Sequence, residues 1–117
     1  MRHVARDARL RRTTDVQRVR RAGASHSDQL FHVSAVVTSG SQSRIAISVP
    51  SRVGIAVRRN RARRRTRAAF VPLLQRVRPA ADVLVSVRSP VVEAPFAELQ
   101  RSAETLLKAL GVLGMPA

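Results

Sequence analysis

The feature that most limits how this chain can fold is segment 58–67, RRNRARRRTR, which holds seven arginines and no acidic residue. Apolar residues follow this run at helical spacing. When segment 55–77 is projected at 100° per residue, they fall within one stripe about 140° wide, which predicts a helix with one core-facing side. Pro72 lies within this pattern and is expected to kink or weaken the helix locally. The stripe consists of Ala62, Thr66, Ala69, Phe70, Leu73, Leu74 and Val77.

The first turns of this predicted helix are basic nearly all round, because Arg59 and Arg63 fall within the stripe and the other five arginines lie outside it. Like charges four residues apart destabilise a helix by a few tenths of a kcal/mol per pair, and positive charge near a helix N-terminus opposes the macrodipole. These turns should therefore extend past the core or meet an anionic partner. The pattern favours a surface that binds a polyanion over an ordinary solvated helix.

Two strands are predicted before this helix and one after it. Segment 30–38, LFHVSAVVT, has strand-like composition, and apolar residues alternate along segment 44–50. A turn-forming cluster at 39–43 separates these segments, which predicts an antiparallel hairpin with a loop of several residues. Segment 82–88, DVLVSVR, is typical of a buried strand, since its three valines share one face and Leu84 lies on the other.

Helices are also expected near both ends of the chain. Segment 13–23 has threonine at its start and glycine at its end, and segment 95–111 has apolar residues at spacings of three and four. The order α-β-β-α-β-α predicts a single-domain α+β fold, a two-layer sandwich in which helices pack on a small mixed sheet. We interpret residues 1–12 as a basic N-terminal arm, mobile or ordered by a partner, and residues 13–117 as the folded domain.

The composition fits one compact domain with a basic surface. Hydrophobic residues make up 44% of the 117 residues, the net charge is +15, and every basic residue except Lys108 is arginine, which pairs bidentately with phosphate. The chain has no cysteine, which excludes disulfides, thiolate catalysis and zinc–thiolate sites. No apolar run approaches the ~20 residues of a membrane span, and no secretion signal is evident. We therefore expect a soluble, cytoplasmic protein.

The sequence offers no set of residues for protein-borne catalysis. Its seven acidic residues are scattered along the chain, and the three histidines are not at metal-ligand spacing. His32, alone in a predicted strand, is expected to be a structural or surface residue. No serine has an assignable base and orienting acid. We therefore predict no catalytic residue and no metal ligand.

Segment 48–70, SVPSRVGIAVRRNRARRRTRAAF, resembles the signature of the bacterial ribonuclease P protein component. That signature is a strand end, V-G-x-A-V, a variable residue, R-N-R and basic residues on the next helical turn. The pattern D-x-Q-x-V-x-x-x-G at 15–23, the basic arm, and R-x-P at 88–90 before the last helix also fit. The matching signature positions are Val53, Gly54, Ala56, Val57, Arg59, Asn60, Arg61, Arg63, Arg64 and Arg67.

The resemblance implies that this is the non-catalytic protein subunit of a ribonucleoprotein endoribonuclease, whose RNA removes the 5′ leader of precursor tRNA. The protein would bind no cofactor, and Mg²⁺ would act through the RNA. The expected partners are ribonuclease P RNA and precursor tRNA, without a membrane; the sequence does not fix the oligomeric state, and we expect a monomer in the complex. Gly54 is expected to permit the strand-to-helix turn, and Asn60 to bond RNA or fix the helix start. The implied RNA-binding residues of domain 13–117 are Arg58, Arg59, Asn60, Arg61, Arg63, Arg64, Arg65 and Arg67.

The resemblance also implies that a cleft between the first helix and the sheet holds the single-stranded leader. The family commonly has aromatic residues there, whereas this chain has Val16, Arg20 and Ser34, so Arg20 would stack its guanidinium on a base where the family uses a ring. The family also often has Asn at the position of Ile55 and Lys near Ser51. The predicted leader contacts are Val16, Arg20, Phe31, His32, Val33 and Ser34.

Three alternatives remain open at this point. A different RNA-binding protein, such as a ribosomal protein, would bind rRNA tightly without affecting tRNA processing. Membrane attachment through the basic helix is disfavoured, because that helix has no tryptophan and has small residues where an inserting face needs bulk. An autonomous nuclease is disfavoured by the scattered carboxylates.

Overall fold

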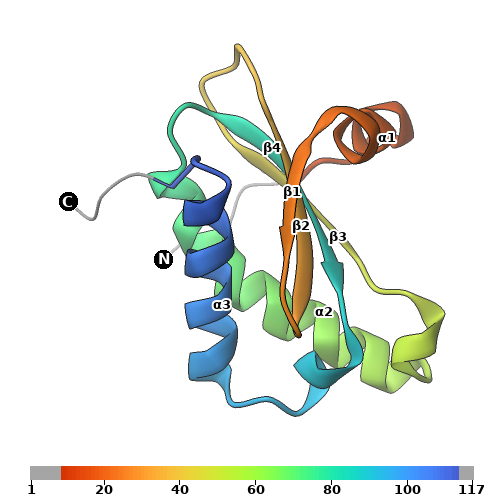
Figure 1. Cartoon of the computed structure of the whole chain (residues 1–117). Coiled ribbons are helices and arrows are strands. Elements are labelled where there is room, and N and C mark those ends of the chain that lie inside the picture. The colour runs from red at the N-terminus through yellow and green to blue at the C-terminus, as the bar shows by residue number, and fades with distance from the viewer. Residues whose placement is uncertain (1–8, 114–117) are drawn as a thin grey trace.

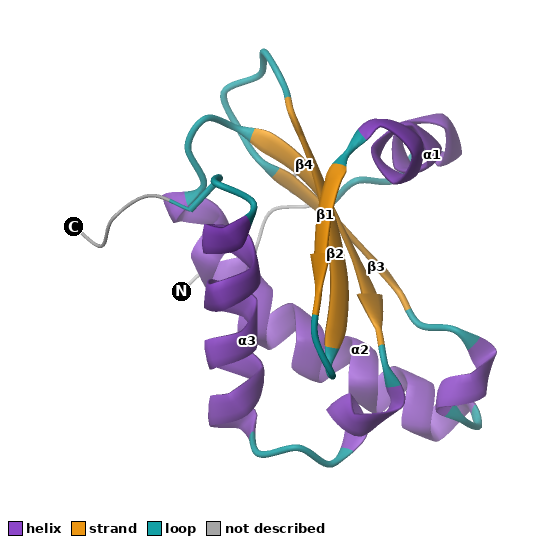
Figure 2. Cartoon of the chain, in the orientation of Figure 1, coloured by secondary structure: helices purple, strands orange, loops and turns teal. Residues whose placement is uncertain are grey.

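The protein is built on one four-stranded mixed sheet with the strand order β1-β2-β4-β3. A computed structural model describes residues 9–113. Strands β1 (Ala24–Ser27), β2 (Phe31–Val37) and β4 (Ala81–Val87) pair antiparallel, and β3 (Arg44–Ser48) runs parallel to β4 at one edge. Figure 2 shows the four strands side by side with helices next to them.

Helices cover both faces of this sheet (Figure 1). Helices α2 (Ala56–Phe70) and α3 (Phe96–Ala109) pack on one face, where the main core lies, and α1 (Thr13–Ala22) packs on the other. Phe31 of β2 and Phe70 of α2 pack edge to face, with ring centroids 5.0 Å apart and planes at 88°, which holds α2 against the sheet. The predicted α+β class and mixed sheet are confirmed, while α1 adds a partial third layer to the two that were predicted.

The predicted hairpin between segments 30–38 and 44–50 is wrong, because β4 lies between β2 and β3. Strand β4 carries apolar side chains on both faces and has six of its seven residues buried. A strand of that kind belongs at the centre of a sheet. Strand β1, ASHS, was not predicted, because it is polar, fully exposed and carries no apolar alternation.

The two long helices follow the predicted apolar stripes, with one shortened end. Helix α2 stops at Phe70 and continues as the 3-10 helix η3 (Val71–Arg76), so the weakening expected from Pro72 occurs as a change of helix type. Helix α3 ends before Gly111, which has the positive φ of 74° that a helix C-terminus often requires.

The folded domain begins before the predicted boundary at residue 13. Leu10 is only 5% exposed, its backbone N–H donates to the carbonyl of Ile45 at 2.8 Å, and Arg9 forms a parallel bridge with the same residue. Burial of Leu10 therefore attaches segment 9–11 to the β3 edge, which corrects the predicted arm at its C-terminal end. The rest of that arm, residues 1–8, lies outside the described residues.

Candidate nucleic-acid interface

All eight residues predicted to bind RNA lie on α2, but they differ in exposure. Asn60, Arg61 and Arg64 are exposed, whereas the other five arginines are half-buried. In Figure 1 the N-terminal end of α2 reaches beyond the lower end of β3. The helix thus combines a core side, with Ala62 and Thr66 fully buried, and a basic side that the core leaves uncovered.

Five arginines of α2 donate hydrogen bonds to backbone carbonyls, and the first of them, Arg58, donates through Nε to Val53 O at 3.2 Å. Arg59 Nε donates to the carbonyl of Gly54 at 3.1 Å, and Arg63 Nη1 to that of Ile47 at 2.9 Å. The other two reach the segment after β4: Arg61 Nε donates to Val92 O at 3.0 Å, and Arg65 donates to Val92 O at 3.3 Å and to Ala94 O. A carbonyl is neutral, so these bonds orient the guanidinium groups without cancelling their charge.

One arginine of α2 has a carboxylate partner among the described residues. Arg58 Nη1 lies 3.0 Å from Glu93 Oε2, and the two side chains are 40% and 71% exposed. Ion pairs this exposed contribute about 0–1 kcal/mol and are screened by salt. As far as residues 9–113 show, the helix therefore keeps most of its positive charge without a compensating acid.

A glycine sets the entry into this helix. The 3-10 helix η2 (Ser51–Val53) ends at Gly54, whose φ of 137° and ψ of −162° lie outside the range of other residues, as the sequence predicted for this turn. The N-cap is Ile55, without a side-chain hydrogen bond. Asn60 stands on the exposed side beyond the first turn and does not cap the helix, so its predicted role at the helix start is wrong.

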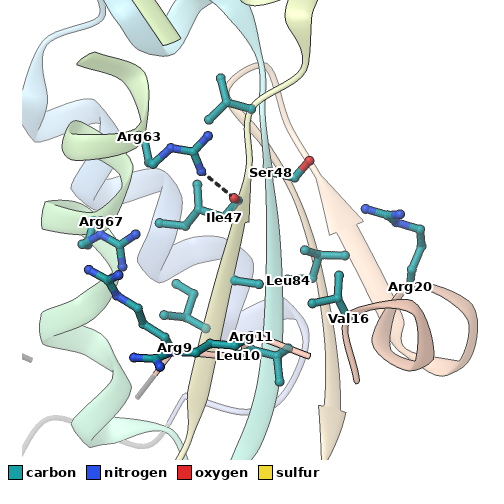
Figure 3. Close-up of a pocket in the computed structure, with 13 residues that line it drawn as sticks. Arg9, Leu10, Arg11, Val16, Arg20, Ile47, Ser48, Arg63, Arg67 and Leu84 are labelled. Atoms are coloured by element: carbon teal, nitrogen blue, oxygen red, sulfur yellow. Dashed lines mark hydrogen bonds between the residues drawn. The ribbon is translucent and has the colours of Figure 1, made fainter. Parts of the chain in front are cut away.

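An open groove of about 600 Å³ runs along the β3 edge (Figure 3). Its walls come from segment 9–11, α1, α2 and β3, with Leu84 of β4 at its base. Among the described residues, the lining contains no acidic residue and no aromatic ring. Five arginines line the groove, namely Arg9, Arg11, Arg20, Arg63 and Arg67.

The positive charges along this groove act on one another. Burial lowers the pKa of Arg67 from its ordinary value, and the neighbouring charges of Arg9 and Arg63 lower it further. Repulsion of this kind is the cost of gathering cations without a counter-ion. The arginine itself remains protonated at any physiological pH, so the groove is a fixed positive surface.

The predicted leader contacts divide between the two faces of the sheet. Val16 and Arg20 line the groove, on its α1 side. His32 and Ser34 alternate with the core residues of β2 and so belong to the face that α1 covers, but they do not line the groove. Phe31 and Val33 are 0% exposed in the main core on the opposite face, so their prediction as contacts is wrong.

A buried ion-pair cluster holds α1 against the sheet, and the sequence gave no indication of it. Asp82, 1% exposed, accepts from Arg18 Nη2 at 2.7 Å and from Arg44 Nε and Nη2 at 3.0 and 2.8 Å. The hydrogen bonds that Arg44 donates to Asp82 raise the pKa of Arg44, and the charges of Asp82 and Asp15 raise it further against the effect of burial. This cluster fixes the position of α1, and with it one wall of the groove.

The described residues offer neither a metal site nor a membrane-spanning helix. No group of three His, Asp or Glu side chains within residues 9–113 could hold a metal ion. In the same part of the chain, every helix is too short or too polar to cross a bilayer. The functional groups that the described residues present are arginine side chains held on the folded domain.

The fold and the site together define a small basic α+β domain that presents arginines to a polyanion. The family model for ribonuclease P matches residues 4–111. The chain is 37% identical to the ribonuclease P protein component of Chloroflexus aurantiacus over 109 residues, which cover 92% of this chain and 81% of that protein. It is 33% identical to that of Shouchella clausii, over 92% of this chain and 88% of that protein. The chain therefore belongs to the ribonuclease P protein family.

Solved structures agree with this assignment. The RNase P protein of Staphylococcus aureus superposes with a TM-score of 0.80 at 29% identity, over 92% of this chain and 98% of that one. The RNase P protein of Thermotoga maritima gives 0.76 at 26% identity, over 86% and 96%. The resemblance predicted from residues 48–70 is thus confirmed over most of the chain. Membership implies an RNA-binding role in tRNA processing, within a nuclease complex.

Proposed function

We propose that this chain is the protein subunit of ribonuclease P and acts with a catalytic RNA to remove the 5′ leader of precursor tRNA in the cytoplasm. The protein binds the catalytic RNA through the basic side of α2. The observation that carries this proposal is the state of the α2 arginines: most are oriented by neutral carbonyls, and within residues 9–113 only Arg58 has a carboxylate partner. An RNA backbone is the partner whose charge relieves their repulsion.

The groove along β3 supplies the second binding surface in this proposal. It is open, and its described lining has arginines from three segments and no acidic residue, which suits a single nucleic-acid strand such as a 5′ leader. Without an aromatic ring in the lining, base stacking on a side chain contributes little here. Leader binding by this chain therefore rests mainly on phosphate contacts.

Hydrolysis belongs to the RNA in this scheme. The described residues contain no cluster of acids that would hold Mg²⁺, so the ions that assist the reaction would be held by RNA phosphates. The protein's part is to neutralise phosphates that would otherwise repel one another when the RNA and its substrate meet. This lowers the concentration of Mg²⁺ that the reaction needs.

The test is cleavage of precursor tRNA by a bacterial ribonuclease P RNA at a magnesium concentration too low for the RNA alone. Adding the purified chain should restore cleavage at the same phosphodiester that the RNA cuts at high magnesium. A structured ribosomal RNA fragment serves as a competitor. If the chain gives no stimulation at any salt concentration, or if the ribosomal fragment binds more tightly, the assignment is wrong and a role on ribosomal RNA is favoured.

A further inference from the structure

Three arginines from two distant segments gather on the α2 side of the β3 edge (Figure 3). Arg9 comes from segment 9–11, and Arg63 and Arg67 stand one turn apart on α2. Arg9 lies outside the sequence signature that first pointed to RNA binding. Its backbone is nevertheless fixed, because the bridge to Ile45 and the burial of Leu10 hold this segment against the strand.

The two α2 arginines of this group are also held in place. Arg63 Nη1 donates to the carbonyl of Ile47 at 2.9 Å, on the edge strand itself. Arg67 is half-buried, and its pKa is lowered by burial and by the charges of its two neighbours. The charges of Arg9 and Arg63 thus both act on Arg67, yet the fold keeps the three side chains in the lining of one groove.

Two acidic residues of the described range lie at the junction of α1 with the sheet, and both have partners there. Asp15 and Asp82 pair with Arg18 and Arg44 at the junction of α1 with the sheet, and neither carboxylate lines the groove. Within residues 9–113 no carboxylate pairs with this cluster, which favours an anion from outside the chain as its counter-ion.

We propose that Arg9, Arg63 and Arg67 form a binding site for one phosphate group of a single nucleic-acid strand lying in the groove. This inference rests on the proposed function, since it assigns a residue-level contact within the predicted leader surface. Guanidinium groups carry only hydrogen-bond donors and form forked pairs with phosphate oxygens. The site makes Arg9 a binding residue, and it joins the groove to the RNA-binding side of α2.

A phosphate explains this arrangement better than a base does. The described lining of the groove offers no aromatic ring for stacking and no acidic acceptor beside the arginine donors, so it lacks the mixed pattern that reads a base edge. It should therefore bind strands of any sequence, and strands without bases.

The experiment measures fluorescence anisotropy of two labelled pentamers, oligouridylate and its abasic counterpart, with the full-length protein. Arg9→Ala and Arg67→Ala should each lower the affinity for both pentamers by about five- to tenfold at 50 mM salt. Each should also reduce the steepness of the plot of log binding constant against log salt concentration by about 0.7. The matched control is Arg101→Ala, which removes the same charge from the exposed surface of α3 and should change affinity less than about twofold.

Two results would overturn the site. One is that Arg9→Ala and Arg67→Ala bind like Arg101→Ala; the other is that the abasic pentamer does not bind wild-type protein. Thermal melts identify any variant that fails to fold, and Arg9→Gln and Arg67→Gln, which keep most of the side-chain length, then take its place with the same expectations. The low-magnesium cleavage assay separates the two proposals. If wild type stimulates cleavage but the Arg9 variants bind the pentamers as wild type does, this site alone is rejected. If the variants lose pentamer affinity but wild type does not stimulate cleavage, the proposed function is rejected.

Discussion

Arginine has a structural role in one region of this protein and a binding role in another. The two regions differ in the group that accepts hydrogen bonds from the guanidinium. At the junction of α1 with the sheet, Arg18 and Arg44 meet the buried carboxylate of Asp82, so their charge is cancelled. On α2, Arg61 and Arg63 meet backbone carbonyls, so their charge is kept. The first arrangement fixes the architecture, and the second presents an oriented positive surface. The comparison shows that the partner atom, more than the residue type, separates a structural arginine from a binding one.

The strongest test of this difference between the two groups of arginines is to screen their charges with salt. If α2 and the groove together neutralise about six phosphates, affinity for ribonuclease P RNA should fall roughly a thousandfold between 50 and 200 mM salt. Fold stability should change little over the same range, because the cluster at Asp82 is buried. Filter binding and thermal melts across the salt series measure the two responses. A flat binding curve would reject phosphate pairing as the main contribution.

Removing the buried carboxylate should act on the fold. Asp82→Ala leaves Arg18 and Arg44 without their partner, and breaking a buried pair costs about 3–5 kcal/mol. Since these arginine side chains are 41% and 35% exposed and can turn to solvent, we expect a loss of about 2–3 kcal/mol in the free energy of unfolding. Urea denaturation checks this. Glu104→Ala, at a half-exposed pair, is the control and should cost under about 1 kcal/mol.

A substitution at the turn into α2 should lower the free energy of unfolding less than loss of the Asp82 carboxylate does. Gly54→Ala places a side chain at φ 137°, a conformation that costs on the order of 1–3 kcal/mol. The new Cβ would also stand 2.8 Å from Arg58 Cδ, although that side chain can move. Gly40→Ala, where φ is not positive and the new Cβ would meet Thr38 Oγ1 at an ordinary contact distance of 3.6 Å, should stay within about 0.5 kcal/mol of wild type. Equal stability of the two variants in denaturant would mean that the Gly54 turn is not strained.

The smallest expected effect is that of pH. The raised pKa of Arg44 contributes stability that is complete below its unfolded pKa, itself strongly alkaline, and is lost only as pH rises through the higher folded pKa. Arg67 has a lowered pKa but remains protonated near neutrality. RNA affinity and unfolding midpoint should therefore stay constant from pH 6.5 to about pH 9. A transition near pH 6–7 in either quantity would point to a histidine that the account leaves out.

The sequence predicted the elements whose information is local. Helices α2 and α3 follow from apolar spacing, and Gly54 from the turn that it must make. Strand order depends on pairing between distant segments, so the place of β4 between β2 and β3 was missed. Strand β1 was missed because an exposed polar edge strand has no apolar period.

The site was predicted in its residues but not in its contacts. The arginine set of α2 is visible in the sequence, yet the carbonyls that orient Arg61 and Arg63 lie 31 and 16 positions away in the chain. The cluster around Asp82 escaped notice for the same reason, as 64 and 38 positions separate this acid from Arg18 and Arg44. Phe31 and Val33 could have been excluded from the leader contacts, since alternation puts them on the face opposite His32 and Ser34.

The central claim, that the uncompensated cations of α2 are the RNA-binding surface, is tested most directly with the double variant Arg61→Ala/Arg64→Ala. Both residues are exposed and neither belongs to the core. The account predicts that affinity for ribonuclease P RNA falls by roughly 10- to 100-fold at 100 mM salt, while the thermal melt stays within a few degrees of wild type and Arg101→Ala binds normally. Unchanged RNA affinity in a folded double variant, or loss of the fold, would contradict it.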